Sequence, residues 1–260
     1  MATRGNAVQS VGKAMELLNY LAAARRPLSL QELALSTGWA KSTIHGLLAA
    51  MREYGVVDQS RLDGKYRLGL RLFELGSVVS GTWDVLLIAK PHLQEIARQT
   101  GESVHIGMLD RSDVLYLDYA DDRRALRIVA EAGTRLSPHC SALGKAILAY
   151  VPEQEALRAL GGRELKAYTP HTITDPALLQ QEFARIREQG YAVEDGEMRV
   201  GLRAVAAPIF NAYKQPAYAI GVTGMFRRVT DETFLLAKQM VMDAAAAISA
   251  ELGYREQLPH

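Results

Sequence analysis

The stretch SLQELALSTGWAKSTIHGLL, residues 29–48, decides how the N-terminal part of this chain folds. Ser29 is a good helix N-cap, and Glu32 three residues later completes a capping box, which predicts the start of a helix. Gly38 supplies the backbone freedom that a tight turn needs. A second helix is expected from there to Tyr54. The order helix, turn, helix predicts a helix-turn-helix motif.

The sequence on either side of this motif completes a small domain. Apolar residues recur at three- and four-residue spacing over residues 7–23, as they do on the buried side of a helix. Residues 56–58 and 63–67 indicate two short strands joined at an Asp-Gly pair, which is a strong hairpin signal. The parts together predict a winged helix-turn-helix domain over residues 1–68.

The exposed surface of this domain carries residues that are suited to duplex DNA. A helix N-terminus directs free N–H groups and a positive dipole end toward a phosphate. We expect DNA contacts from the polar and cationic residues of the two helix starts and the wing: Ser29, Lys41, Ser42, Thr43, His45, Arg52, Arg61, Lys65 and Tyr66. Simpler alternatives stay open, namely helix capping for Ser42 and Thr43 and solubility for the wing cations.

Composition and charge agree with a soluble DNA-binding protein. The chain has 260 residues, 48% hydrophobic and 23% charged, which fits one or two ordinary globular domains. Residues 1–68 hold nine lysines and arginines against five acids, a net charge of +4, so the remainder carries −3 of the total +1. DNA binding should therefore weaken as the salt concentration rises.

The cysteine content and the hydropathy of the chain limit the cellular compartments in which we expect the protein. The single cysteine, Cys140, excludes an internal disulfide framework and argues against a cysteine-rich zinc site. No apolar run reaches the roughly 18 to 20 residues that a membrane span needs, and the N-terminus has no apolar stretch typical of a secretory signal. We expect a reducing, cytoplasmic setting, no membrane contact, no metal and no cofactor.

The following residues predict a helical linker and then a second domain. Residues 69–100 return to a helical pattern with a break near Gly81, and Pro91 is expected to kink or start a helix segment. This linker could pack against its own copy in a dimer or only within one chain. Residues 101–260 alternate between strand and helix patterns, including a strand near 127–129 and a helix that Asp175 begins and Gly190 ends.

The second domain is expected to hold a mainly antiparallel sheet with helices packed on it. Its strand patterns, which include residues 205–210 and 217–223, follow one another like hairpins, unlike those of a doubly wound parallel sheet. The fold class is therefore α+β.

Several motifs resemble those of the IclR-type bacterial transcription regulators. Residues 29–48 resemble the DNA-reading element of that family, and residues 66–69 match the end of its wing. One departure is Gly46, because the family usually has Arg directly after the histidine of this helix. Glycine inside a helix costs about 1 kcal/mol relative to alanine, and the change removes a cation from the DNA-reading helix.

The C-terminal half resembles the same family at residues 137–146, 169–176, 190–197 and 201–210. The resemblance implies a GAF-like α/β ligand-binding domain, a small organic acid as effector, double-stranded operator DNA as partner, and homodimers or homotetramers. It places the effector near these residues: His139, Cys140, Ser141, Ala142, Leu143, Glu194, Asp195, Ala204, Gly221 and Thr223. Lys145 lies one turn into the helix that follows Ser141.

Two positions in this set bear on effector specificity. The family often has Cys at the site of Ala204 and Ser at that of Gly221, and both residues are small and apolar here. A larger and drier pocket would favour a bulkier acid, aromatic or sugar-derived, over a very small keto acid.

The same residues leave other function classes open. We expect no enzyme, because the sequence has no phosphate-binding glycine loop and no nucleophile elbow. One alternative is a metal- or redox-sensing regulator that uses Cys140 with His105 and His139. Another is a nucleoid-type DNA binder whose C-terminal half only oligomerises.

Overall fold

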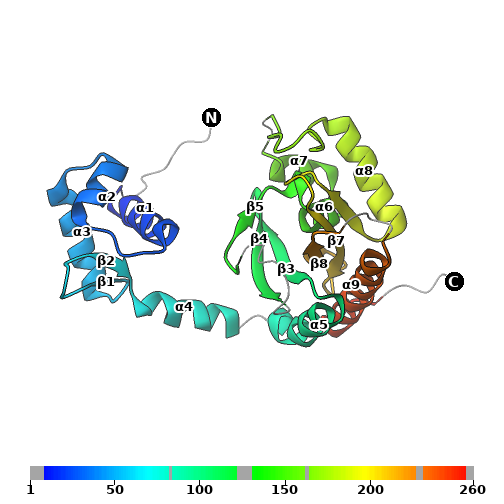
Figure 1. Cartoon of the computed structure of the whole chain (residues 1–260), viewed down its shortest axis with the longest axis horizontal. Helices are drawn as coiled ribbons and strands as arrows, with labels where there is room; N and C mark the ends of the chain where they lie inside the picture. Colours follow the sequence, from blue (N-terminus) through cyan, green and yellow to red (C-terminus); the bar gives the residue numbers. More distant parts are fainter. Residues whose placement is uncertain (1–8, 82–83, 122–130, 162–163, 227–230, 256–260) are drawn as a thin grey trace. The chain divides into compact units, whose positions relative to one another are not determined.

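The chain divides into two compact units, residues 1–83 and 84–260. The computed structural model describes residues 9–81, 84–121, 131–161, 164–226 and 231–255 (Figure 1). The stretch 69–100, expected as a linker, falls on both units. Its first helix belongs to the N-terminal unit and its second helix to the C-terminal unit.

Three helices carry the core of the N-terminal unit: α1 (Gln9–Ala24), α2 (Leu30–Thr37) and α3 (Lys41–Glu53). The capping box begins α2 as expected, because Glu32 N donates to Ser29 Oγ at 3.2 Å and Ser29 N donates to Glu32 Oε2 at 2.8 Å. Gly38 ends α2 with a left-handed φ of 70°. The predicted helix-turn-helix is therefore confirmed.

A two-stranded wing follows α3. Strands β1 (Val57–Gln59) and β2 (Tyr66–Leu68) pair antiparallel. Leu28 forms an isolated antiparallel bridge to Tyr66, with N–O distances of 2.9 and 2.8 Å. This bridge connects the wing to the segment before α2. The buried core of the unit joins all these elements through Leu17, Leu21, Leu28, Leu33, Ile44, Leu48, Met51, Val57 and Tyr66.

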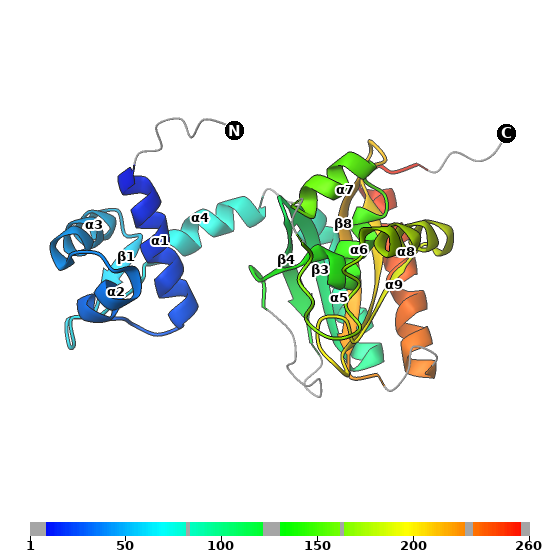
Figure 2. The same ribbon diagram turned by 90° about the horizontal axis from the view of Figure 1, so that it is seen from above.

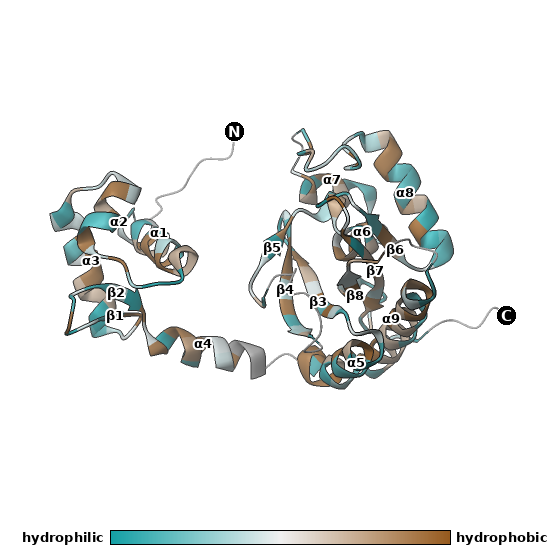
Figure 3. Cartoon of the chain, viewed as in Figure 1, coloured by the Kyte–Doolittle hydropathy of each residue, from teal (hydrophilic) through white to brown (hydrophobic). Residues whose placement is uncertain are grey.

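The last helix of this unit, α4 (Leu70–Gly81), differs from the others because none of its described side chains is fully buried. Its ribbon includes hydrophobic turns (Figure 3). An amphipathic helix with its apolar residues in water is unusual in an isolated soluble unit.

The C-terminal unit is built on a six-stranded sheet in the order β5-β4-β3-β8-β7-β6, and every pair is antiparallel. The strands are β3 (Ser103–Asp110), β4 (Asp113–Ala120), β5 (Arg135–Leu136), β6 (Ala192–Asp195), β7 (Arg203–Phe210) and β8 (Pro216–Gly224). The predicted antiparallel sheet is confirmed. The strand expected near residues 127–129 lies outside the described residues.

Helices cover both faces of this sheet (Figures 1 and 2). Helices α5 (Asp84–Thr100) and α9 (Glu232–Glu251) pack on one face and on each other. The short helices η1 (Pro138–Cys140) and α6 (Ala142–Leu148) lie on the other face, where α8 (Pro176–Gln189) packs outside α6, and α7 (Glu153–Ala159) follows α6 in the chain.

Local signals set the ends of α8 as expected. Asp175 Oδ1 accepts from Ala177 N at 2.7 Å, and Gly190 ends the helix with a φ of 83°. Of the two alternatives predicted for Pro91, the start of a helix segment is excluded, since this residue lies inside α5. Proline has no N–H to donate to the carbonyl of Leu87 four residues earlier, and Leu87 lies on the exposed side of α5, with 71% of its surface accessible. Among the described residues, no helix has both the length and the apolar character needed to cross a bilayer.

Candidate functional site

Helix α3 separates a buried side from an exposed polar side. Ile44, Leu48 and Met51 enter the core, whereas Lys41, Ser42, Thr43, His45 and Arg52 are exposed. The N-cap residue of α3 is Ala40, which makes no side-chain capping bond. Ser42 and Thr43 lie after it in the first turn, so helix capping does not account for their hydroxyls. Their position is that of the groove-reading residues in a helix-turn-helix.

The wing exposes only part of the set of residues for which the sequence predicts DNA contacts. Arg61 is exposed and Lys65 is half-buried, with its ammonium 3.8 Å from Asp63. The structure does not support the predicted DNA contact of Tyr66, because this residue is 4% exposed and packs in the core of the unit. Side chains alternate along a strand, so the neighbour Arg67 points outward, where it bonds Asp58 at 2.6 Å.

Two other predicted DNA contacts have partners within the unit. Both the hydroxyl and the N–H of Ser29 bond Glu32, so its hydroxyl serves the cap of α2. Arg52 Nη1 donates to Gln59 Oε1 at 2.7 Å, which ties the end of α3 to the wing. Both pairs lie at the protein surface or near it.

Gly46 is not needed for packing. A Cβ built at this position meets nothing within 4 Å, and its backbone is ordinary helix. The departure from the family pattern is therefore free of any steric requirement in this unit.

A cavity of about 260 Å³ lies in the C-terminal unit between α6 and the sheet. Eight of the ten predicted effector residues line it: Cys140, Ser141, Ala142, Leu143, Glu194, Ala204, Gly221 and Thr223. His139 and Asp195 do not. Asp195 is exposed and its Oδ1 lies 2.6 Å from Arg203 Nε, while His139 Nε2 donates to the Lys166 carbonyl at 3.0 Å.

The sheet register explains why distant motifs meet at this cavity. Glu194 pairs with Ala204, and Ala204 pairs with Thr223, so these three side chains form one row across β6, β7 and β8. Gly221 pairs with Ala206 in the next row. A Cβ at Gly221 would lie 2.8 Å from the Val205 carbonyl oxygen and 2.9 Å from Ala206 Cβ. Close strand packing thus favours glycine at this position.

Sequence reasoning missed seven lining residues: Tyr116, Leu136, Met198, Arg199, Leu202, Val205 and Ala206. Met198 and Arg199 lie in the short segment between two of the quoted motifs, and that position was the available signal for them. Tyr116 comes from β4, where a bulge beside Gly107 places it against His105 at a ring distance of 4.7 Å.

Glu194 is the buried acid of the cavity. It is 2% exposed, and its Oε1 accepts from Met198 N at 3.1 Å. Burial raises the pKa of Glu194 to about 7, an effect that the backbone hydrogen bonds partly oppose. Its carboxyl group can thus exchange a proton near neutral pH.

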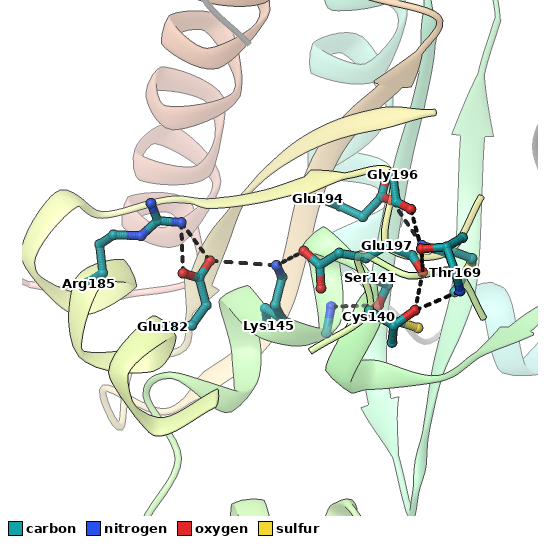
Figure 4. Close-up of polar contacts among 12 residues, drawn as sticks. Cys140, Ser141, Lys145, Thr169, Glu182, Arg185, Glu194, Gly196 and Glu197 are labelled. Carbon is teal, nitrogen blue, oxygen red and sulfur yellow. Dashed lines mark hydrogen bonds and ion pairs between the residues drawn. The ribbon is translucent and has the colours of Figure 1, made fainter. Parts of the chain in front are cut away.

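Lys145 lies one turn into α6, a position from which it could contact an effector, but its side chain is not available to a ligand. It is 1% exposed, and its ammonium bonds Glu197 Oε1 and lies 3.5 Å from Glu182 Oε1 (Figure 4). Arg185 bonds Glu182 from the outer side at 2.7 Å. The ammonium group is therefore paired with two carboxylates, and none of these three residues lines the cavity.

Besides the ion pair between Lys145 and Glu197, hydrogen bonds from the segment before α8 hold the loop between β6 and β7 in place. Thr169 Oγ1 donates to the Gly196 carbonyl at 2.7 Å (Figure 4), and Thr172 Oγ1 donates to that of Glu197 at 2.6 Å. This loop supplies Met198, Arg199 and Leu202 to the cavity wall. Two threonines and one buried ion pair thus position one wall of the cavity.

The groups proposed for metal or redox sensing do not converge. Cys140 is fully buried, its Sγ–H donates to the Ser137 carbonyl at 3.6 Å, and burial raises its pKa to about 12. A reactive thiol needs a lowered pKa. His105 stacks on Tyr116, and within the described ranges no cluster of three potential metal ligands occurs. The metal- or redox-sensing alternative is therefore not supported.

Comparisons with known proteins identify both units. Residues 10–61 match the IclR helix-turn-helix domain, and residues 78–250 match the bacterial transcriptional regulator IclR C-terminal domain. The chain is 33% identical over 247 residues to the HTH-type transcriptional regulator XynR of Escherichia coli K12, covering 95% of this chain and 98% of that one. It is also 33% identical to the transcriptional repressor IclR of the same strain, covering 95% and 90%.

Solved structures agree with this assignment. The crystal structure of Thermotoga maritima IclR matches with a TM-score of 0.79 and 32% identity, covering 95% of this chain and all of that chain. An IclR homologue of Microbacterium hydrocarbonoxydans, solved with 4-hydroxybenzoate, has the same fold at a TM-score of 0.83 and 23% identity, covering 94% and 98%. The relatives named by function are transcriptional regulators and not enzymes. This chain belongs to the IclR family of bacterial transcriptional regulators, with an N-terminal helix-turn-helix unit that binds DNA and a C-terminal effector unit.

Proposed function

We propose that a small organic acid, held in the cavity between α6 and the sheet, controls how this regulator binds its operator. The observation that carries the proposal is the cavity itself, a largely apolar space whose lining brings together residues from η1, α6 and five strands. A site of this kind, with few polar groups, is typical of small-molecule binding. It lies in a different unit from α3, so binding acts by way of the connection between the units.

The size of the cavity favours one ring or a comparable acid. A cavity of about 150 Å³ is enough to hold benzene in an engineered protein, and this cavity is about 260 Å³. Small residues at Ala204 and Gly221 leave this space open. The homologue solved with 4-hydroxybenzoate contains an acid of that size, and an aromatic or sugar-derived acid is our proposal for this chain.

For the DNA-binding unit, we propose that α3 reads the major groove. The contacts would come from Lys41, Ser42, Thr43 and His45, with Arg61 and Lys65 on the backbone beside the wing. The exposed side chains at the start of α3 support this assignment. Because the operator of a bacterial regulator is chromosomal, we infer a cytoplasmic location.

We further propose that the protein acts as a homo-oligomer, a homodimer or homotetramer, in which α4 contacts a second copy. Leu70 is 80% exposed, Phe73 73% and Val78 68%. Exposed apolar residues at helical spacing fit a symmetric contact between two copies of one helix. Two DNA-binding units would then meet two half-sites about one helical turn apart, or a multiple of that.

A mobility-shift assay on the chain's own upstream DNA, with a panel of carboxylic acids, tests the proposal. We expect a retarded complex whose midpoint shifts with at least one acid, because a ligand that favours one state must change the population of that state. A complex that ignores every acid would instead favour the alternative in which the C-terminal unit only oligomerises.

A further inference from the structure

We propose that Arg199 binds the carboxylate of the effector at the rim of the cavity, and that Glu194 accepts a hydrogen bond from the effector at the inner end of the cavity. The effector is then a hydroxylated carboxylic acid whose acid group points outward. This inference rests on the proposed function and names the substrate class of that same cavity.

The charges of the neighbouring basic residues are already matched. Lys145 is buried between Glu197 and Glu182 and does not line the cavity. Arg203 lies against Asp195 at 2.6 Å and donates to the Phe226 carbonyl at 2.6 Å. If Lys145 turned to a ligand it would leave two buried carboxylates unpaired, which is costly. Arg203 would have to leave both Asp195 and the Phe226 carbonyl.

Arg199 differs from both of them. Of the described residues that line the cavity, it is the one cation, and it is exposed, which places it at the rim. Within the described part of the chain, no hydrogen bond or ion pair engages its guanidinium. Only its backbone carbonyl is used, accepting from Leu202 N at 3.0 Å as the loop turns. A guanidinium keeps its charge and matches a carboxylate with two parallel hydrogen bonds.

The position of Glu194 sets the direction of the ligand. Its side chain is buried in the cavity wall, with one oxygen bonded to Met198 N. A ligand carboxylate placed beside it would require one of the two acids to hold a proton, because two like charges in a poorly solvated space are unfavourable. A hydroxyl group can instead donate to it. Thr223, two strands away in the same row, is a further hydroxyl on this inner side.

The first test compares two probes that differ only in the acid group. Binding of 4-hydroxybenzoate and of 4-hydroxybenzamide to the full chain is measured by calorimetry for the wild type, Arg199→Ala and Arg158→Ala. Arg158 is an exposed arginine of α7 that does not line this cavity. We expect the wild type and Arg158→Ala to prefer the acid roughly tenfold or more, as charged hydrogen bonds do. Arg199→Ala should bind both probes about equally.

Retained acid preference in Arg199→Ala would overturn the inference. So would an equal loss of both probes, since that loss is not specific to the carboxylate. Failure of the wild type to bind the acid, or a preference for the amide, would also overturn it. Retention of upstream DNA is measured on the same samples without probe, so a failure of the DNA-binding function is recorded separately.

The second test concerns the inner end. The probes are 4-hydroxybenzoate and 4-methylbenzoate, which have nearly the same shape. We expect the wild type to prefer the hydroxylated acid several-fold, roughly as one hydrogen bond to a charged or polar partner provides, and Glu194→Leu to lose or reverse that preference. An unchanged preference in Glu194→Leu would show that the hydroxyl does not meet Glu194.

Discussion

At the scale of single residues, Gly46 stands out because nothing in the structure requires it. No atom lies within 4 Å of an added Cβ, and the residue sits in the middle of α3. We expect Gly46→Ala to stabilise α3 by about 1 kcal/mol, because glycine loses more backbone entropy in a helix than alanine. Amide hydrogen exchange along α3 should slow by roughly fivefold. Faster exchange in the variant would contradict this account of the position.

Glu194 should make the stability of the C-terminal unit depend on pH. Its folded pKa of about 7 lies above the ordinary value of 4.5, so the folded state holds the proton more tightly than the unfolded chain. Stability linked to this group is full below pH 4.5 and is lost as the pH rises through 7. Relative to Glu194→Gln, the wild type should lose about 3 kcal/mol between pH 4.5 and pH 8. Denaturant titrations at both pH values measure the difference, and parallel pH profiles would refute it.

The family resemblance predicted part of the site, and the rest depends on contacts that only the fold creates. Eight lining residues followed from motifs that lie within or beside helix starts and strand ends. Tyr66 was misassigned because its burial depends on the bridge to Leu28, a contact between segments far apart in sequence. The roles of Lys145 and Arg199 could not be predicted from the sequence either. Only the fold determines which cation pairs with a carboxylate and which lies at the rim of the cavity.

At the scale of elements, the loop between β6 and β7 is the connection that shapes the cavity. The bond from Lys145 to Glu197 reaches it from α6, and Thr169 and Thr172 reach it from the segment before α8. Local signals could predict where α2 and α8 begin and end, because caps are made by neighbours in the chain. They could not predict the strand order, which depends on pairing between distant residues.

Removal of one partner in this buried pair should be strongly destabilising. We expect Lys145→Met to cost about 3 to 5 kcal/mol, because Glu197 and Glu182 would lose the ammonium while buried. The double variant Lys145→Met with Glu197→Gln should cost less than the sum of the single changes. Equilibrium unfolding of the three variants gives the coupling energy, and strictly additive values would argue against this role of the pair.

At the scale of the whole molecule, we propose that α4 forms the contact between copies and so sets how many DNA-binding units act together. Phe73 lies in the middle of its exposed apolar residues. We expect Phe73→Asp to weaken self-association roughly tenfold or more, as the loss of an interface aromatic does, with no loss of folded monomer. Sedimentation velocity measures this, with Glu74→Lys as a control at the neighbouring polar position, which pairs with Arg71 on the surface. An unchanged oligomer in Phe73→Asp would mean that α4 is not the contact.

We propose above all that the N-terminal unit reads duplex DNA under the control of an acid bound in the C-terminal unit. Fluorescence anisotropy on the chain's own upstream DNA tests it most directly, with the wild type and a Lys41→Ala, Thr43→Ala double variant, each with and without 4-hydroxybenzoate. We predict a specific complex that the double change weakens by about 2 to 4 kcal/mol and that the acid shifts in the wild type. A wild-type protein that binds no duplex even at low ionic strength, or binds with an affinity that neither the double change nor the acid alters, would contradict it.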